Sequence, residues 1–513
     1  MVSGGGPLLE PGEQAAAQAR LGLVLDVTAR MAGSLDLRAV AQALAETVVP
    51  QFADGATVEL VEDVLRSGGG VGMIASPMVR VASAGTLEAS ADGDLHVVPL
   101  IARGRVLGRA SFARRPGTTS YGAADRALAD ELAARAAIAL DNVRLYDGAR
   151  STAVELQRSL LPASQPRITG VEMAHRYLPG RETEVGGDWF DVLPLSCGRV
   201  AFVIGDVMGR GLRAAAAMGQ LRTAVRTLAV LDLMPDELLS QLDHLAMGIA
   251  QVQLATCVYA VFDPVTRELC FATAGHPPPL LGGPDEPARF LPTPSGAPLG
   301  VGGVPFEAAA ESVRDGSRLL LYTDGLIESR GVDLDVGLEA LAAAFGGGPV
   351  WLEPLCDHVL EVLGRAEGHD DDVAMLVAEL HGLEPSRIVA WQLHGVETEI
   401  AASRVRVRSA LLRWGLPQMV ETSELLVSEL ATNALRYGKG PIELQVLLLD
   451  DVVTFSVADA DAPLPRFRRS SYDDEGGRGL QLVAMLASRW GARATPTGKV
   501  VWCELPRTRA GAR

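Results

Sequence analysis

Aspartates recur where strongly apolar β runs begin or end between residues 167 and 379. They are Asp188, Asp191, Asp206, Asp324 and the run Asp370, Asp371 and Asp372. A carboxylate at the end of a buried strand is costly unless another charge offsets it. Adjacent strands would bring several of these groups together, and a divalent cation is the simplest counterion. The pattern therefore predicts a β-rich fold that gathers carboxylates in one place.

The donor types indicate which cation such a site would take. Oxygen ligands alone suit Mg²⁺ or Mn²⁺, and two such ions that share a carboxylate can activate water and polarise a phosphoryl group. Glycines at 186, 187, 205, 209 and 211 would let the backbone approach a bound water or substrate. Each Asp-Gly alone is typical of a turn. The five cysteines are widely spaced without a CxxC pair, so we expect neither a disulfide framework nor a thiolate zinc site.

Length and charge exclude several classes of protein. A chain of 513 residues is long enough for about three domains. The net charge of −17 argues against a sequence-independent grip on nucleic acid. No apolar stretch reaches the length of a membrane-spanning helix, and the first residues lack a signal-peptide pattern, so we expect a cytoplasmic protein that does not bind membranes.

The first third of the chain changes from helical to β periodicity and back. Residues 15–45 predict two helices broken at Gly33-Ser34, and β runs follow at 57–61, 95–101 and 105–112, with a hairpin turn at 103–104. A long helix opens at Asp125 and stops before Pro162. Its apolar stripe, from Leu128 to Leu160, is either a dimer seam or a face packed on its own domain, and dimerisation is slightly favoured.

This order resembles a GAF domain over residues 15–147, after a flexible tail at 1–14. The resemblance rests on VPLIARGRVLG (98–108) and ALDNVRLY (139–146). It implies a sensor that binds a small ligand or dimerises. His96 is alone in its predicted strand, so it is more readily explained as an ordinary strand residue than as a ligand to a chromophore or metal.

Residues 148–382 resemble the metal-dependent protein phosphatases (PPM) of the SpoIIE/RsbU type. The matching motifs are ELQRSLLP (155–162), GGDWFD (186–191), GDVMGRG (205–211), ATCVYAVFD (255–263), AGHPP (274–278), YTDGLIE (322–328) and DDVA (371–374). The resemblance implies a β-sandwich flanked by helices. It also implies that phosphoserine or phosphothreonine is hydrolysed by metal-activated water, without a covalent phospho-enzyme.

The phosphatase resemblance also implies roles for individual residues. Asp206 would bridge both metals as the central catalytic ligand. The other implied ligands are Asp188 on one side, Asp324 and Asp371 on the other, and Gly187 and Val207 through backbone carbonyls or bound water. Asp370 and Asp372 remain alternatives to Asp371.

Two further features of this segment have competing explanations. His276 has the chemistry of a general acid, but a structural residue at a Pro-rich bend is the better interpretation. The Ala-rich helix predicted over 212–231, with Arg213, Arg222 and Arg226, is explained by core packing or by a role as a switch element.

The C-terminal segment has the elements of a nucleotide site. Glu429 and Asn433 are four apart and share a helical face, and a β run ends at Asp459. A GGRG turn at 476–479 opens a helix whose free backbone N–H groups would bind phosphate.

Residues 388–507 resemble the ATP-binding (GHKL) α/β sandwich of gyrase, Hsp90, histidine kinases and anti-sigma-factor serine kinases, nearest to the last. The resemblance assigns Asn433 to Mg²⁺, Glu429 to activation of a substrate hydroxyl and Asp459 to the adenine amino group. It assigns Gly477, Arg478 and Gly479 to the phosphates of ATP. The usual Asp-x-Gly-x-Gly is DADAP here (459–463), and no phosphoacceptor helix precedes Glu429, so histidine-kinase activity is not expected.

Together these features predict a homodimeric signalling protein of mixed α/β and α+β domains. A GAF sensor would regulate a phosphatase and a kinase-like module that act on one STAS-type anti-anti-sigma factor, and so control a sigma factor. The alternative is a non-enzymatic scaffold that binds ATP and sequesters a sigma factor.

Overall fold

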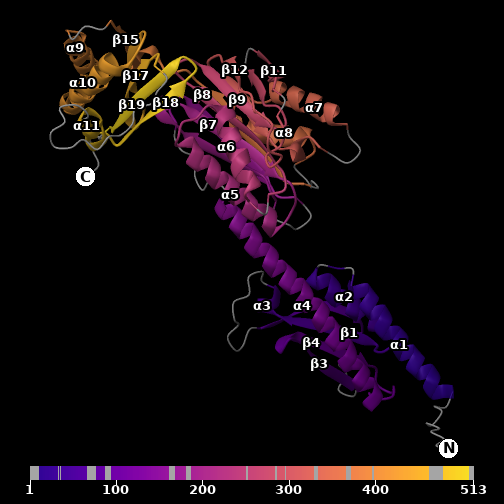
Figure 1. Ribbon diagram of the computed structural model, residues 1–513. Helices are drawn as coiled ribbons and strands as arrows, with labels where there is room; N and C mark the ends of the chain where they lie inside the picture. The colour runs from indigo at the N-terminus through magenta and orange to yellow at the C-terminus, as the bar shows by residue number, and fades with distance from the viewer. Residues whose placement is uncertain are drawn as a thin grey trace, which may run out of the picture. The chain divides into compact units, whose positions relative to one another are not determined.

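The computed structural model describes residues 11–32, 34, 36–65, 77–86, 94–160, 168–180, 186–249, 252–283, 286–294, 296–328, 333–365, 371–394, 398–461 and 478–507. The chain forms two compact units, Met1–Leu156 and Gln157–Arg513 (Figure 1). None of the described helices combines the length and apolarity needed to cross a bilayer.

The first unit contains a four-stranded antiparallel sheet in the order β2-β1-β4-β3. Its elements are α1 (Pro11–Ala32), α2 (Leu37–Val48), β1 (Gly55–Val61), α3 (Glu62–Leu65), β2 (Met78–Gly85), β3 (Asp94–Ala102), β4 (Arg105–Arg114) and α4 (Ala123–Leu160). The predicted helix pair, the three strands and the long helix are all present, whereas β2 was missed. Arg103 and Gly104 both have positive φ, which fits the two-residue hairpin predicted there. Helix α1 begins at Pro11, inside the segment predicted as a tail.

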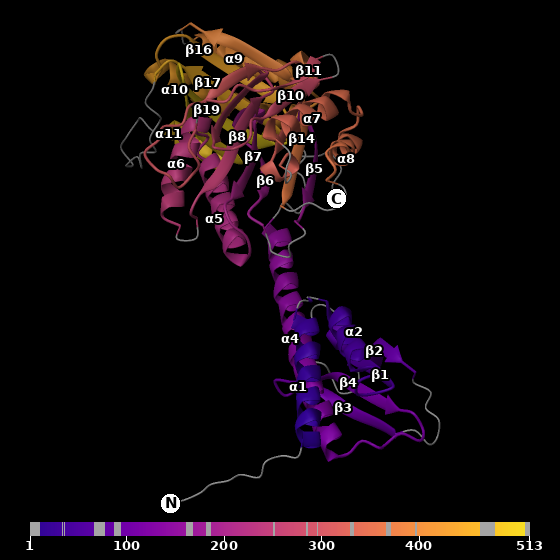
Figure 2. The same cartoon turned by 90° about the vertical axis from the view of Figure 1, so that its right-hand side faces the viewer.

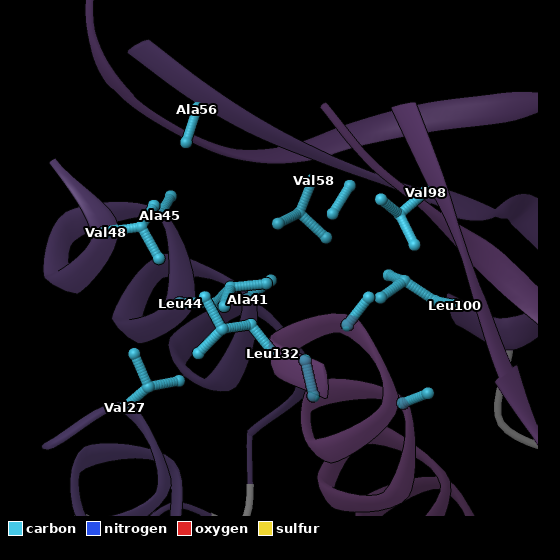
Figure 3. Close-up of a cluster of buried hydrophobic side chains, with 14 of the residues drawn as sticks. Val27, Ala41, Leu44, Ala45, Val48, Ala56, Val58, Val98, Leu100 and Leu132 are labelled. Carbon is cyan, nitrogen blue, oxygen red and sulfur yellow. The ribbon is translucent and has the colours of Figure 1, made fainter. Parts of the chain in front are cut away.

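The core of this unit lies between α2, α4 and one face of the sheet. Figure 3 shows Leu44 of α2 and Leu132 of α4 beneath Val58 and Leu100 of the sheet, and all four side chains are buried. The apolar stripe of α4 is buried in this core as far as Val143. For residues 128–143 the structure therefore favours packing on the helix's own domain over a dimer seam.

The second unit begins with two antiparallel five-stranded sheets, in the orders β11-β10-β13-β14-β5 and β12-β9-β8-β7-β6. The strands are β5 (Val171–Leu178), β6 (Trp189–Pro194), β7 (Val200–Val207), β8 (Ala255–Asp263), β9 (Glu268–Ala274), β10 (Leu280–Gly283), β11 (Glu286–Phe290), β12 (Ala309–Ser312), β13 (Ser317–Tyr322) and β14 (Val373–Leu380). The helices are α5 (Leu212–Ala229), α6 (Pro235–Met247), α7 (Leu334–Gly347) and α8 (Leu352–Val362).

These elements form four layers, with a helix pair outside each sheet (Figure 2). Phe202 and Leu376 belong to the core between the sheets. Helices α5 and α6 pack on the outer face of the β7 sheet through residues such as Leu221, and α7 and α8 cover the β13 sheet through residues such as Leu341. Because both faces of the central strands are buried, they form nearly continuous apolar runs, which explains why the sequence predicted them well.

The rest of the second unit is an antiparallel sheet in the order β15-β16-β17-β19-β18. Its strands are β15 (Ile388–Leu393), β16 (Ile442–Leu448), β17 (Val452–Asp459), β18 (Arg489–Thr495) and β19 (Gly498–Pro506), and its helices are α9 (Thr398–Arg413), α10 (Val420–Tyr437) and α11 (Arg478–Leu486). The helices bury one face of the sheet around Phe455. On its other face Leu449 and Trp502 form a small apolar cluster with Cys197, which lies in the β6–β7 turn.

Candidate functional site

The strand alternation directs three polar residues to one end of the space between the two phosphatase-like sheets. In β7, Phe202 and Ile204 face that space, so Asp206 has the same parity. Asp188 directly precedes β6, and Asp372 directly precedes β14. By the same alternation, both side chains point to this side of their strands. Side chains distant in sequence therefore meet at one edge of the sandwich.

Glycines allow the backbones around Asp206 to approach closely. A Cβ at Gly187 would lie 2.2 Å from the carbonyl oxygen of Val207 and 2.9 Å from Oδ1 of Asp206. A Cβ at Gly205 would lie 2.3 Å from the ring of Trp189, which is fully buried opposite it in the β6–β7 pair. These two glycines therefore cannot carry side chains without a shift of the backbone, and they bring Gly187 and Val207 beside Asp206.

Thr323 holds Asp188 in place. Its hydroxyl donates a hydrogen bond to Oδ2 of Asp188 at 2.7 Å and accepts one from the backbone N–H of Ala374 at 2.9 Å. Thr323 is fully buried at the end of β13. The sequence analysis assigned it no role, although its position directly before Asp324 was a usable signal.

The carboxylates perturb one another. The pKa of Asp206 is raised to about 6, mainly by burial; a hydrogen bond with Asp188 lowers it, and the charges of Asp324, Asp371 and Asp372 contribute to the increase. Burial is also the main cause of the raised pKa values of Asp188 and Asp324. The pKa of Asp206 therefore depends on Asp188 and on the other three carboxylates, as expected for a central ligand.

The three consecutive aspartates before β14 differ in environment. Asp372 is buried and its Oδ1 accepts a hydrogen bond from the backbone N–H of Gly180 at 2.8 Å. Asp371 is more exposed and lies 3.8 Å from Arg210. Asp370 lies outside the described residues. The assignment of the metal ligand to Asp371 stays a prediction. The charge of Asp372 contributes to the raised pKa of Asp188.

The donor set fits a hard divalent cation, because it consists of carboxylate and backbone oxygens. The glycine approach described above supplies the backbone oxygens. Within the described part of the chain, however, no three acidic, histidine or cysteine side chains converge as a ready-made metal site. The residues therefore fit a divalent cation in the type of their donor atoms and in their closeness to one another.

The surroundings of His276 favour a structural role over that of a general acid. Burial lowers its pKa to about 4. Its Nε2 lies 3.0 Å from the carbonyl oxygen of Tyr322 and its Nδ1 lies 2.7 Å from Oγ1 of Thr256. A neutral ring that donates from Nε2 and accepts at Nδ1 satisfies both contacts. His276 thereby joins β8 to the end of β13 that carries Thr323.

Helix α5 is fixed to the strand that follows Asp188. Asp191 of β6 accepts hydrogen bonds from Nε of Arg222 at 3.1 Å and from Nη2 of Arg226 at 2.8 Å. Its side chain is almost fully buried, so the two arginines of α5 offset a charge that the alternation of β6 directs outward. Two of the three arginines that the sequence analysis noted on this helix thus have a defined packing role.

The second group of predicted residues gathers at helix α10. A Cβ at Gly479, in the first turn of α11, would lie 2.5 Å from Oε2 of Glu429 and 3.4 Å from Nδ2 of Asn433. The Nδ2 atom of Asn433 is buried and has no hydrogen-bond partner among the described residues. Gly477 lies outside the described residues, as does the side chain of Arg478, so the structure brings together only part of the predicted phosphate site.

Asp459 lies at the opposite end of this candidate site. A Cβ at Gly438, directly after α10, would lie 3.0 Å from Cγ of Asp459. Asp459 is buried and forms an ion pair with Lys499, whose Nζ donates to Oδ1 at 2.9 Å. The sequence analysis did not single out Lys499.

Two family comparisons match the second unit. Residues 196–381 match the SpoIIE family, described as Stage II sporulation protein E, and residues 396–504 match the histidine kinase-like ATPase domain. The chain carries a SpoIIE domain and a histidine kinase-like ATPase domain. The SpoIIE match includes Asp206, Asp324 and Asp371, and Asp188 lies just before it. The ATPase match includes Glu429, Asn433 and Asp459.

Curated relatives resemble part of the chain. It is 26% identical over 152 residues to the phosphoserine phosphatase RsbP of Bacillus subtilis, covering 28% of this chain and 38% of that protein. It is 21% identical over 180 residues to the phosphoserine phosphatase RsbU of the same organism, covering 35% of this chain and 53% of that protein. The alignments therefore span about half of these relatives' length or less.

Among solved structures, the chain is 29% identical to the RsbU and RsbW domains of Rv1364c from Mycobacterium tuberculosis. That match covers 67% of this chain and 95% of the other, with a TM-score of 0.41. The phosphatase domain of SpoIIE from Bacillus subtilis, with a fragment of its regulatory domain, is 16% identical. It covers 41% of this chain and 64% of the other, with a TM-score of 0.36.

Proposed function

We propose that the SpoIIE domain hydrolyses phosphoserine or phosphothreonine on a partner protein, with two Mn²⁺ or Mg²⁺ ions. The observation that carries this proposal is the set of buried, mutually perturbing carboxylates around Asp206, which has oxygen donors only. Asp206 would bridge the ions, and Asp188, Asp324 and Asp371 would complete the carboxylate ligands. Gly187 and Val207 would contribute through backbone oxygens or bound water.

Bound divalent ions would lower the pKa of a water molecule and polarise the phosphoryl group. The protein residues have supporting tasks. Thr323 orients Asp188 through its hydroxyl hydrogen bond. His276, whose two ring nitrogens both have hydrogen-bond partners, would stay neutral and anchor the end of β13.

A STAS-type anti-anti-sigma factor is the proposed substrate, as the phosphatase resemblance implies. The test is phosphate release from such a protein, phosphorylated on serine, in the presence of Mn²⁺. Wild type should release phosphate and Asp206→Ala should not, whereas Asp357→Asn, an exposed carboxylate outside the cluster, should retain activity. No release by wild type, or full activity of Asp206→Ala, would reject the proposal.

For the ATPase domain we propose MgATP binding and phosphate transfer to the same partner. Asn433 would hold Mg²⁺, Glu429 would activate the substrate hydroxyl and Asp459 would accept from the adenine amino group. Gly477, Arg478 and Gly479 would bind the phosphates. The buried Nδ2 of Asn433, which has no hydrogen-bond partner in the described part of the chain and lies near Gly479, supports this assignment.

The competing function is a scaffold that binds ATP and sequesters a sigma factor. Labelling a STAS serine from radioactive ATP separates the two. Transfer that disappears in Glu429→Gln while ATP binding persists would support the kinase. ATP binding without any transfer by wild type would support the scaffold.

We further propose that residues 15–147 form a GAF sensor in a homodimeric, cytoplasmic protein, followed by the phosphatase at 148–382 and the ATPase at 388–507. The antiparallel sheet, which packs against α2 and α4 through one hydrophobic core, supports a sensor fold. Light scattering of the purified chain tests the dimer, since a monomer mass at micromolar concentration would exclude it.

A further inference from the structure

The buried ion pair between Asp459 and Lys499 lies on the face of the ATPase sheet that the helices cover. Val457 of β17 and Val501 of β19 both pack in the core beneath the helices. Asp459 and Lys499 are each two residues from these positions and are directly paired across the two strands. By the alternation of a strand, both side chains therefore face α10, the helix that carries Glu429 and Asn433.

The hydrogen bonds around this pair leave a donor and an acceptor side by side. Oδ1 of Asp459 accepts from Lys499 Nζ at 2.9 Å and from the backbone N–H of Asp461 at 2.8 Å. Among the described residues, the other carboxylate oxygen of Asp459 has no hydrogen bond. Lys499 Nζ also donates to the backbone carbonyl of Asp461 at 3.0 Å and lies 3.6 Å from Oδ2 of Asp461, an ion-pair distance that is too long for a hydrogen bond. Two of its three N–H groups are therefore hydrogen-bonded among the described residues.

A lysine is an unusual choice if its only task is to neutralise Asp459. Lys499 is only 7% exposed, and burying an ammonium costs free energy that its partners must offset. Position 499, opposite Asp459, could instead carry a small hydroxyl side chain. It could also carry an apolar side chain if Asn replaced Asp459. The pair provides what neither alternative does, a charged acceptor next to a charged donor at a site that a planar base would contact.

Adenine presents the complementary pattern on one edge. Its N6 amino group donates a hydrogen bond, and the adjacent ring nitrogen N1 accepts one. We propose that Lys499 is a base-recognition residue that donates to N1 of adenine while Asp459 accepts from N6. This inference rests on the proposed ATP site, and it assigns the choice of base to Lys499 together with Asp459.

The experiment measures binding of Mg²⁺ complexes of ATP and of 1-deaza-ATP, which lacks N1, to the full chain by calorimetry. A hydrogen bond from a charged donor corresponds to about 10-fold or more in affinity. Wild type should bind 1-deaza-ATP at least about 10-fold more weakly than ATP. Lys499→Met should bind ATP about as weakly as wild type binds 1-deaza-ATP, and should not distinguish the two nucleotides.

Lys439→Met is the matched control. Lys439 pairs with Asp461 at 2.9 Å, but its side chain is 77% exposed, and among the described residues no ion pair joins it to Asp459. This variant should keep the preference of wild type for ATP. A purely structural Lys499 would instead give a Lys499→Met variant that binds both nucleotides more weakly by the same factor, and that outcome overturns the inference.

The two proposals fail in different ways. If wild type binds neither nucleotide, the proposed ATP site is wrong and this inference falls with it. If wild type binds ATP, and Asn433→Ala abolishes binding, but ATP and 1-deaza-ATP bind equally, only the role of Lys499 is wrong. The comparison of nucleotides on wild type needs no variant, so equal binding of ATP and 1-deaza-ATP would overturn the inference even if Lys499→Met does not fold.

Discussion

The two candidate sites treat buried carboxylates in opposite ways. In the SpoIIE domain, Asp188 and Asp206 lie beside one another, and among the described residues neither has an ion-pair partner; burial and neighbouring charges raise the pKa of both. In the ATPase domain, Asp459 is similarly buried but is paired with Lys499. The first site, as proposed above, would need cations from outside the chain to offset its charge, whereas the second has Lys499. Removing a carboxylate from the first site should therefore stabilise the fold, whereas removing the lysine from the second should destabilise it.

Asp206→Asn should have the largest effect on activity. Loss of a second-shell partner commonly costs 10–100-fold, so loss of a bridging ligand should lower phosphate release by more than about 100-fold. The same substitution should raise the free energy of unfolding in a chelating buffer by about 2 kcal/mol, because it removes a carboxylate whose charge the fold disfavours. Urea denaturation at pH 7.5 measures this change. Destabilisation would contradict the view that the carboxylates repel one another.

Lys499→Met should change stability in the other direction. It leaves the charge of Asp459 buried without its partner, which should cost about 3 kcal/mol. The double variant with Asp459→Asn should recover most of this loss, because no buried charge remains. Urea denaturation of the two single variants and the double variant forms the cycle. If the double variant is as unstable as the sum of the singles, the ion pair is not the cause.

His276 should make stability depend on pH. Its pKa is near 6.5 when unfolded and about 4 when folded, so the unfolded state binds more protons between these values. Stability should therefore be fully present above pH 6.5 and decline as the pH falls towards 4. Between pH 7.5 and pH 5 this one group should account for about 2 kcal/mol. The difference between wild type and His276→Gln isolates it from the titrating aspartates, and identical pH profiles would refute the assignment.

Thr323→Val should have the smallest of these effects. The variant keeps the shape of the buried side chain but removes the hydrogen bond to Asp188. We expect about a 10-fold increase in the Mn²⁺ concentration needed for half-maximal phosphate release. Thr454→Val is the control, because Thr454 is also buried in a strand but its hydroxyl has no partner among the described residues. An unchanged Mn²⁺ requirement in Thr323→Val would mean that the hydroxyl does not position Asp188.

Much of the fold followed from local patterns in the sequence. The long helix α4, the strands around Asp206 and Asp459, and helix α10 were predicted because each has a strong period or a continuous apolar run. Strand β2 was missed because it lies mostly exposed and its apolar and polar residues do not alternate regularly. The stripe of α4 illustrates another limit, since periodicity identifies an apolar face but not what covers it.

The sequence by itself determined which residues are candidates for the chemistry. Aspartates at strand ends and the Glu429–Asn433 spacing identified two groups of polar residues, because strand and helix periods constrain side-chain direction locally. Tertiary structure alone decided which groups share a partner. Thr323 reaches Asp188 across 135 residues, and Lys499 reaches Asp459 across 40. Pairing between strands fixes such contacts, and no local period records which strands will pair. The charge balance of each site is therefore a property of the fold.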